Sequence, residues 1–176
     1  MGQRLTDKSA LNNHTGTGDL YMIVDVSDTT GSAAGTSKKL DSKFVIQTDK
    51  ISLSSADIQG LDSTAKTLVS APGSGYAVIP ISAMLMCTYA APEQTNRSYM
   101  LIGHESGGTF ASLELHPMKN KTNDNTYKFT TMNSNAVPTK QGSIDNLPLI
   151  LHTDSTAFDG GFTADLYITY QIVLLS

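Results

Sequence analysis

Short apolar runs, separated by turn-forming residues every eight to fifteen residues, make up the chain from about residue 62 onward. No stretch of ten or more residues in this part has helical periodicity, and evenly spaced short runs are typical of antiparallel sandwiches. We therefore predict an all-β fold with a jelly-roll-like antiparallel β-sandwich over residues 62–176. Pro80 lies inside a long run and predicts an edge, a bend or a change of sheet. The expected strands are Thr67–Ala71, Tyr76–Tyr89, Ser98–Ile102, Thr109–Leu115, Tyr127–Thr131, Leu147–Leu151 and Thr163–Leu175.

The last run, TADLYITYQIVLLS, alternates along its whole length. One face carries Ala164, Leu166, Ile168, Tyr170, Ile172 and Leu174, and the other carries Asp165, Tyr167, Thr169, Gln171, Val173 and Leu175. We expect the first face to lie in the core, because its side chains are apolar. The second face mixes polar and apolar side chains, which fits a surface between subunits better than open solvent. Tyr167, Val173 and Leu175 are therefore the predicted oligomer contacts.

Residues 1–61 are predicted to form a small N-terminal β module. DLYMIVDVSD alternates and is rich in β-branched residues, so it predicts a strand. TTGSAAGTS is expected to be a loop, and KKLDSKFVIQT is expected to return as a second short strand. LSSADIQGLD predicts one helical turn, with Ser54 or Ser55 as the N-cap and Gly60 near its end.

Composition favours assembly over nucleic-acid binding. Charged residues make up 16% of the chain, against about 25% in typical domains, and serine, threonine, asparagine and glycine take their place. Such a surface fits a protein that packs against copies of itself. The net charge of −4 argues against a nucleic-acid partner, since phosphate binding needs a basic face. No run approaches the roughly 20 apolar residues of a membrane helix, and MGQRLTDKSALNN lacks the apolar core of a signal peptide. We expect synthesis in a cytoplasm without membrane insertion.

Catalytic and metal motifs are not evident. In VDVSDTTGSAAGTSKK, Gly31 and Gly35 are one residue too close for a phosphate-binding loop, and Thr36-Ser37 separate the second glycine from Lys38. The four histidines form no HxH or HExxH pair. The acids Asp145, Asp154 and Asp159 fall in predicted turns, where aspartate is favoured for backbone reasons. We expect no enzyme activity, no cofactor and no metal. Cys87, in an apolar run, is expected to be a buried, inert thiol.

Two parts of the sequence resemble structural proteins of tailed bacteriophages. The first is the N-terminal segment, in which the match is carried by Val24, Asp25, Val26, Ser27, Asp28, Thr29, Thr30, Ala33, Ala34, Gly35, Thr36, Ser37, Lys38 and Lys39. The second comprises VSAPGSGYAVIPIS and NLPLILHTDSTAFDGGFTADLYITYQIV, which are similar to β-sandwich domains of phage head fibres and related fibre proteins. The matching residues lie between Val24 and Val173.

This resemblance implies a homotrimeric virion protein, made in the infected bacterium and bound to the capsid or another virion protein. The N-terminal module would be the anchor, through Val24, Asp25, Val26, Asp28, Lys38 and Lys39. Because no long fibrous shaft separates the modules, we expect a short head fibre or a capsid decoration protein.

A tail-associated fibre or adhesin module that binds host-surface glycans is the alternative. Sugar-binding sandwiches often stack sugars on exposed aromatic rings, and Tyr89, Tyr99 and Tyr127 are the possible contacts. The same tyrosines also fit a simpler role, in which their rings cover the edge of a sheet core.

Overall fold

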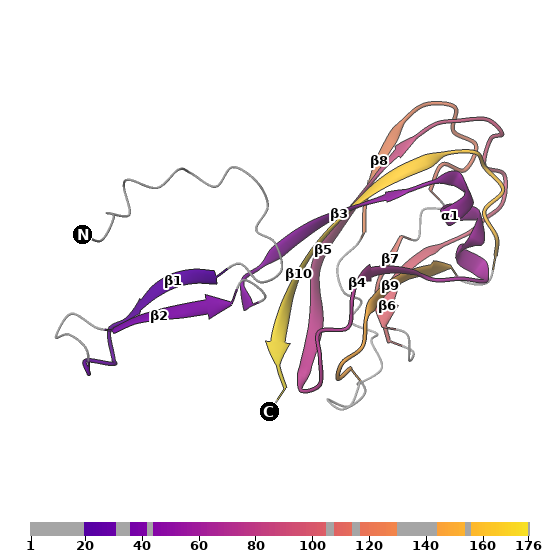
Figure 1. Cartoon of the computed structure of the whole chain (residues 1–176). Helices are drawn as coiled ribbons and strands as arrows, with labels where there is room; N and C mark the ends of the chain where they lie inside the picture. Colours follow the sequence, from indigo (N-terminus) through magenta and orange to yellow (C-terminus); the bar gives the residue numbers. More distant parts are fainter. Residues whose placement is uncertain are drawn as a thin grey trace. The chain divides into compact units, whose positions relative to one another are not determined.

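The computed structural model describes residues 20–30, 36–41, 44–104, 108–113, 117–129, 144–153 and 156–175 (Figure 1). The chain divides into two compact units, Met1–Val45 and Ile46–Ser176. The predicted boundary after residue 61 is therefore wrong. The segment after Val45 forms a strand that pairs with the last strand of the sandwich, and this pairing places it in the second unit.

Within the N-terminal unit, β1 (Leu20–Asp25) and β2 (Thr36–Asp41) form a two-stranded antiparallel sheet. Their register pairs Leu20 with Asp41 and Asp25 with Thr36. The first predicted strand thus contains β1. The second predicted strand, KKLDSKFVIQT, is divided: its first residues belong to β2 and its last residues begin β3 (Gln47–Leu53).

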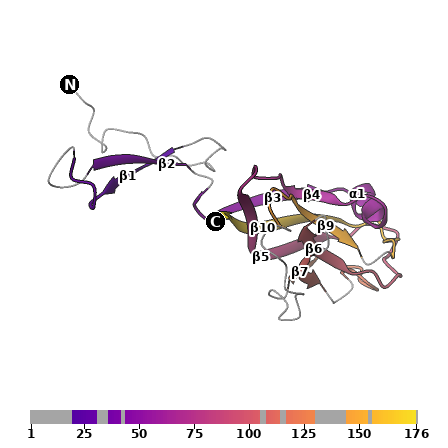
Figure 2. The same ribbon diagram turned by 90° about the horizontal axis from the view of Figure 1, so that it is seen from below.

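In its described residues, the sandwich unit is all-β apart from one short helical segment, as predicted (Figures 1 and 2). One four-stranded sheet has the order β3-β10-β5-β8, and the other has the order β4-β9-β6-β7. The remaining strands are β4 (Lys66–Val69), β5 (Tyr76–Thr88), β6 (Met100–His104), β7 (Gly108–Leu113), β8 (Asn125–Lys128), β9 (Leu149–Thr153) and β10 (Thr163–Leu174). The seven strands predicted for the sandwich overlap β4 to β10, with ends that differ by a few residues.

The antiparallel pairs are nested about the β6–β7 connection. β6 pairs with β7, β5 with β8, β4 with β9 and β3 with β10. Two further pairs, β10 with β5 and β9 with β6, join these hairpin arms into the two sheets. The outermost strands of the nest, β3 and β10, are thus paired although they lie more than a hundred residues apart.

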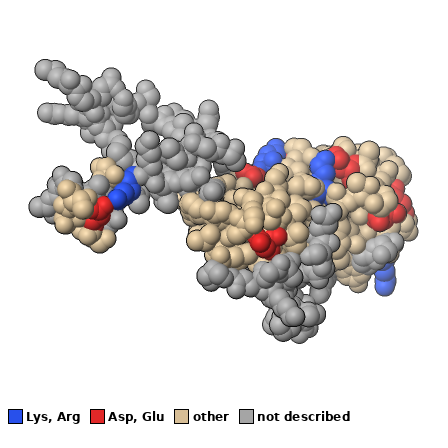
Figure 3. Space-filling model, turned by 60° about the horizontal axis from the view of Figure 1, so that its bottom comes forward, with Lys and Arg blue, Asp and Glu red and all other residues tan. Residues whose placement is uncertain are grey.

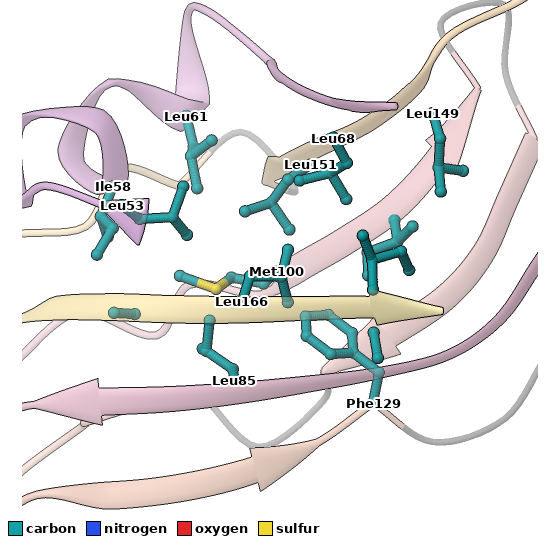
Figure 4. Packing of buried hydrophobic residues seen from close by; sticks show 14 of the residues in the cluster. Leu53, Ile58, Leu61, Leu68, Leu85, Met100, Phe129, Leu149, Leu151 and Leu166 are labelled. Carbon is teal, nitrogen blue, oxygen red and sulfur yellow. The ribbon is translucent and has the colours of Figure 1, made fainter. Parts of the chain in front are cut away.

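One short helix, α1 (Ser55–Gln59), follows β3 and continues into the 3₁₀ turn η3 (Gly60–Asp62). Ser54 is the N-cap, as predicted: its hydroxyl accepts from the Asp57 N–H at 3.1 Å, and the Asp57 carboxylate accepts from the Ser54 N–H at 3.0 Å. Ile58 and Leu61 are buried. The helical segment therefore adds apolar side chains to the core (Figure 4).

Between the two sheets lies one hydrophobic cluster (Figure 4). Each fully buried leucine or isoleucine contributes about 1.5–3 kcal/mol, so this cluster is the main source of stability. Both sheets and the helical segment contribute to it, with Leu53, Ile58, Leu61, Leu68, Leu85, Met100, Phe129, Leu149, Leu151 and Leu166 among its members.

The inner face of β10 is buried from Ala164 to Tyr170, as predicted, and the Tyr170 hydroxyl donates to Gln47 Oε1 at 2.8 Å. Ile172 is half-buried and packs against the core cluster, in agreement with the prediction. At Leu174, which is 69% exposed, the prediction is wrong. The β3 partner ends opposite Tyr170, so the last residues of β10 have only β5 beside them among the described strands.

Pro80 marks a β-bulge. Thr169 pairs with Ser82 but Tyr170 pairs with Pro80, so Ile81 is an extra residue on β5. Such an insertion reverses which residues of a strand face inward. Val78 and Pro80 are buried before the bulge, whereas Ala83 is the first buried residue after it.

Candidate functional site

The outer face of the β3-β10-β5-β8 sheet has two halves, and the half toward the end of β3 carries paired charges. Lys50 Nζ lies 2.8 Å from Asp165 Oδ2 and 6.0 Å from the centre of the Tyr167 ring. Ser52 Oγ donates to Asp165 Oδ1 at 2.7 Å. The hydrogen bond from Lys50, followed by that from Ser52, lowers the pKa of the Asp165 carboxyl. The charges of Lys50 and Asp165 thus compensate each other within the sheet.

The half toward the end of β10 is apolar. We call Ile46, Ile79, Ile81 and Val173 the isoleucine patch. Ile46 is 63% exposed and directly precedes β3, while Ile81, the bulge residue, is 40% exposed. Ile79 and Val173 are half-buried, and Ile79 pairs with Gln171 on the outer side of β10. In the view of Figure 3 most of the described surface of the sandwich is uncharged, and its charged side chains lie in small separate groups.

The predicted oligomer contacts lie at three different places. Tyr167 is half-buried beneath Lys50, in the charged half of the face. Val173 belongs to the isoleucine patch. Leu175 follows β10, is half-buried, and donates its N–H to the Gly75 carbonyl at 2.8 Å. The sequence pattern did not indicate Ile46 or Ile81, because neither belongs to the alternation of β10.

The three tyrosines proposed for glycan contact do not form an open platform. Tyr89 and Tyr127 are partly buried and pack against the core, and the Tyr127 hydroxyl accepts from the Met118 N–H at 3.0 Å. Tyr99 is half-buried. The structure thus places Tyr89 and Tyr127 where the simpler prediction has them, at the margin of the core.

In the N-terminal unit, two of the predicted anchoring residues interact. Lys38 Nζ donates to Asp28 Oδ2, and Thr30 donates to Asp28 Oδ1 through its N–H at 3.0 Å and its hydroxyl at 2.6 Å. Val26 is 75% exposed beside this turn. The backbones of the other three predicted residues lie in β1 and β2, and their side chains lie outside the described part: Val24, Asp25 and Lys39.

A network that sequence reasoning missed joins the loops at one end of the sandwich. The Oε1 atom of buried Gln94 accepts from the N–H groups of Asp159, at 3.0 Å, and Gly160, at 2.7 Å. Asp159 in turn accepts from the N–H groups of Thr95, at 2.8 Å, and Asn96, at 3.1 Å. This confirms the expected backbone role of Asp159 in a turn. The glycine pair that follows Asp159 was the sequence feature that could have indicated close packing at this loop.

Asp145 has a similar backbone role, since its carboxylate accepts from the Gly75 N–H at 2.7 Å. Gly75 has a φ of +82°, which favours glycine. Asp154 lies outside the described residues. The predicted turn-forming acids that the structure describes therefore bind backbone rather than converge on a cleft.

A groove of about 360 Å³ beside α1 is lined by Ser54, Asp57 and Lys66 among others. Lys66 Nζ donates to Asp57 Oδ1 at 2.7 Å, and Ser54 Oγ donates to Asp57 Oδ2 at 2.6 Å. The hydrogen bond from Lys66, followed by those from Ser54, lowers the pKa of the Asp57 carboxyl. The arrangement caps α1 and attaches it to β4.

Within the described residues, no group of three or more histidine, cysteine or acidic side chains is placed to bind a metal ion. His104 Nδ1 lies 2.8 Å from the Pro148 carbonyl, and His152 Nδ1 lies 3.1 Å from the Thr153 carbonyl. The glycine-rich segment between Gly31 and Gly35 lies outside the described part.

Comparison of the chain with protein-family models, curated proteins and solved structures gave no match. Among the described residues, no helix has both the length and the apolar character needed to cross a membrane.

Proposed function

We propose that this protein is a non-enzymatic structural component of a tailed-phage virion, acting as a homotrimeric head fibre or capsid decoration protein. The observation that carries the proposal is the uncharged apolar half of the β3-β10-β5-β8 face, which lies on the sandwich unit, whereas the proposed anchoring residues lie on the N-terminal unit. Exposed apolar surface of this kind marks protein contacts in soluble proteins.

Strand order supports a jelly roll as the fold of the sandwich. A jelly roll consists of eight strands in two sheets, connected as Greek keys. The nested pairs of β3 to β10 have the form of one long hairpin rolled into two four-stranded sheets. Jelly rolls are common in viral capsid proteins, so the topology agrees with the proposed class.

The N-terminal unit supports an anchoring role. Its described strands form one two-stranded sheet, and such a sheet is marginally stable in water without further packing. Contact with another virion protein would supply that packing. Asp28, bound to Lys38 and Thr30, would fix the turn after β1 in the form that the partner meets.

Binding to particles that lack the protein would test this anchor. Lys38→Gln removes the ion pair with Asp28 and should lower the fraction of protein that sediments with the particles. Lys50→Gln is the matched control, because it removes the ion pair with Asp165 on the sandwich at similar side-chain exposure (49% against 44% for Lys38). The proposal is contradicted if mass spectrometry of purified virions finds no peptide of this chain, or if the protein is monomeric by light scattering.

Glycan binding by a tail-associated fibre remains the second proposal. The three tyrosines predicted to contact the glycan are half-buried and not fully exposed: Tyr89, Tyr99 and Tyr127. A glycan array with the folded protein separates the two proposals: reproducible binding that is lost in Tyr99→Ala would favour the adhesin.

A further inference from the structure

Charge is distributed unevenly over the outer face of the β3-β10-β5-β8 sheet. Lys50 and Asp165 lie in one half, and Lys128 lies at the edge strand β8. Around the isoleucine patch, the described residues that face outward are uncharged and include Thr48, Thr169 and Gln171. Thr48 and Thr169 are hydrogen-bonded to each other through their hydroxyls at 2.9 Å.

The patch lies on β5 and β10 and at the residue that precedes β3. Gln171 on β10 pairs with Ile79 on β5, and Ile46 precedes Gln47, the residue of β3 that pairs with Tyr170. Neighbouring strands of a sheet are about 4.8 Å apart, and β3 and β5 lie on either side of β10, so Ile79 and the start of β3 flank the same part of β10. Ile81 and Val173 extend the patch along β5 and β10. The four apolar residues therefore lie near one another, around Gln171.

Charge complementarity indicates what covers this surface. A polyanion or a charged peptide needs opposite charges, which the described residues of this half of the face do not present. The same surface on another copy meets no like charges, and the centres of homo-oligomeric interfaces are depleted in charge and enriched in apolar area. The partner that fits is a second copy of this chain.

We propose that copies of the chain associate through the isoleucine patch, an inference that rests on the proposed homotrimer and names its contact surface. Ile46 is the first residue of the sandwich unit, and the chain enters that unit from the N-terminal unit at this point. Association at the patch therefore brings together the Val45 ends of the N-terminal units. When several N-terminal units are joined in one oligomer, binding of the first unit to a surface raises the effective concentration of the others at that surface. The oligomer therefore binds more tightly than a single unit does.

The test of the inference is light scattering over a dilution series, which measures the oligomeric state. It compares the full wild-type chain with three variants: Ile81→Glu, Ile46→Glu and Met86→Glu. Met86 is the matched control: it lies on β5 like Ile81 and is similarly exposed (44%), but it pairs with Asp165 in the charged half. Ile46→Glu lies outside the strands, so it tests the patch without altering the bulge. We expect the two isoleucine variants to weaken association by about tenfold or more, and Met86→Glu to leave it unchanged.

Circular dichroism confirms that each variant is folded. If wild type is monomeric at every concentration, the proposed homotrimer fails and the inference fails with it. If wild type is oligomeric and both isoleucine variants associate as tightly as wild type, only the inference is overturned. Equal loss of association in all three variants also overturns it, because the contact would then not be confined to the patch.

Discussion

The side-chain oxygen of Gln94 accepts a hydrogen bond from the backbone N–H of Gly160 at 2.7 Å, and a side chain at Gly160 would place its Cβ 2.9 Å from the Gln94 Cβ. The buried Gln94 amide thus helps to hold the β5–β6 and β9–β10 connections together, alongside the hydrogen bonds of Asp159, and the close approach requires a glycine at position 160.

Replacing Gln94 with alanine should destabilise the sandwich. The substitution leaves the N–H groups of Asp159 and Gly160 without their acceptor, and each buried unsatisfied group costs about 1–3 kcal/mol. We expect the free energy of unfolding to fall by about 2–4 kcal/mol in urea denaturation. Glu93→Ala, at the exposed neighbouring position, should change it by less than about 0.5 kcal/mol. Equal stability of the two variants would show that the network is not structural.

Two leucines of β10 should respond differently to truncation. Leu166 is fully buried, so Leu166→Ala should lower the free energy of unfolding by about 2–5 kcal/mol. Leu174, on the same strand but 69% exposed, should lose less than about 0.5 kcal/mol on the same change. Thermal denaturation of both variants measures the difference. A large loss in Leu174→Ala at protein concentrations where the wild type is monomeric would contradict the exposed position.

Acid should weaken the end of the sandwich that α1 caps. Because Lys66 and Ser54 lower the pKa of the Asp57 carboxyl below its ordinary value of 3.8, the unfolded chain binds this proton more readily than the folded protein does. The stability that Asp57 contributes is therefore complete above about pH 4 and is lost as the pH falls further. Urea midpoints measured from neutral pH down to acid should fall less steeply in Asp57→Asn than in wild type. The exposed Asp62→Asn is the control and should keep the wild-type slope.

Cys87 should resist thiol reagents while the protein is folded. Burial, and secondarily the charge of Asp124, raises the pKa of its thiol to about 12, so the reactive thiolate is scarce at neutral pH. We expect labelling by a disulfide reagent to be slow in native buffer and complete within the mixing time in denaturant. Native labelling at the denatured rate would place Cys87 at the surface.

Strand positions were predictable because apolar alternation is local. The buried side chains from Ala164 to Tyr170 follow a period of two, and Ser54 with Asp57 supplied a recognisable helix start. Pro80 correctly indicated an irregularity, since proline lacks the N–H that a regular strand uses.

Long-range pairing was not predictable from local pattern. β3 was assigned to the N-terminal module because it follows the β1–β2 region in sequence, whereas its partner β10 begins at Thr163. The exposure of apolar residues on β5 and β10 was not predictable for a related reason. Exposure of Leu174 depends on where β3 ends, and exposure of Ile81 depends on a one-residue bulge, which simple alternation does not represent.

The central position of β10 also has a kinetic consequence. This strand lies between β3 and β5, yet it is the last of the described strands to be translated. During synthesis, β3 and β5 therefore lack their shared hydrogen-bonding partner until β10 has left the ribosome. The hydrophobic cluster, to which β10 contributes, cannot form completely before then. Folding dominated by such distant pairings is slow, and a chain whose translation terminates before Thr163 would expose its apolar core residues and be prone to aggregation.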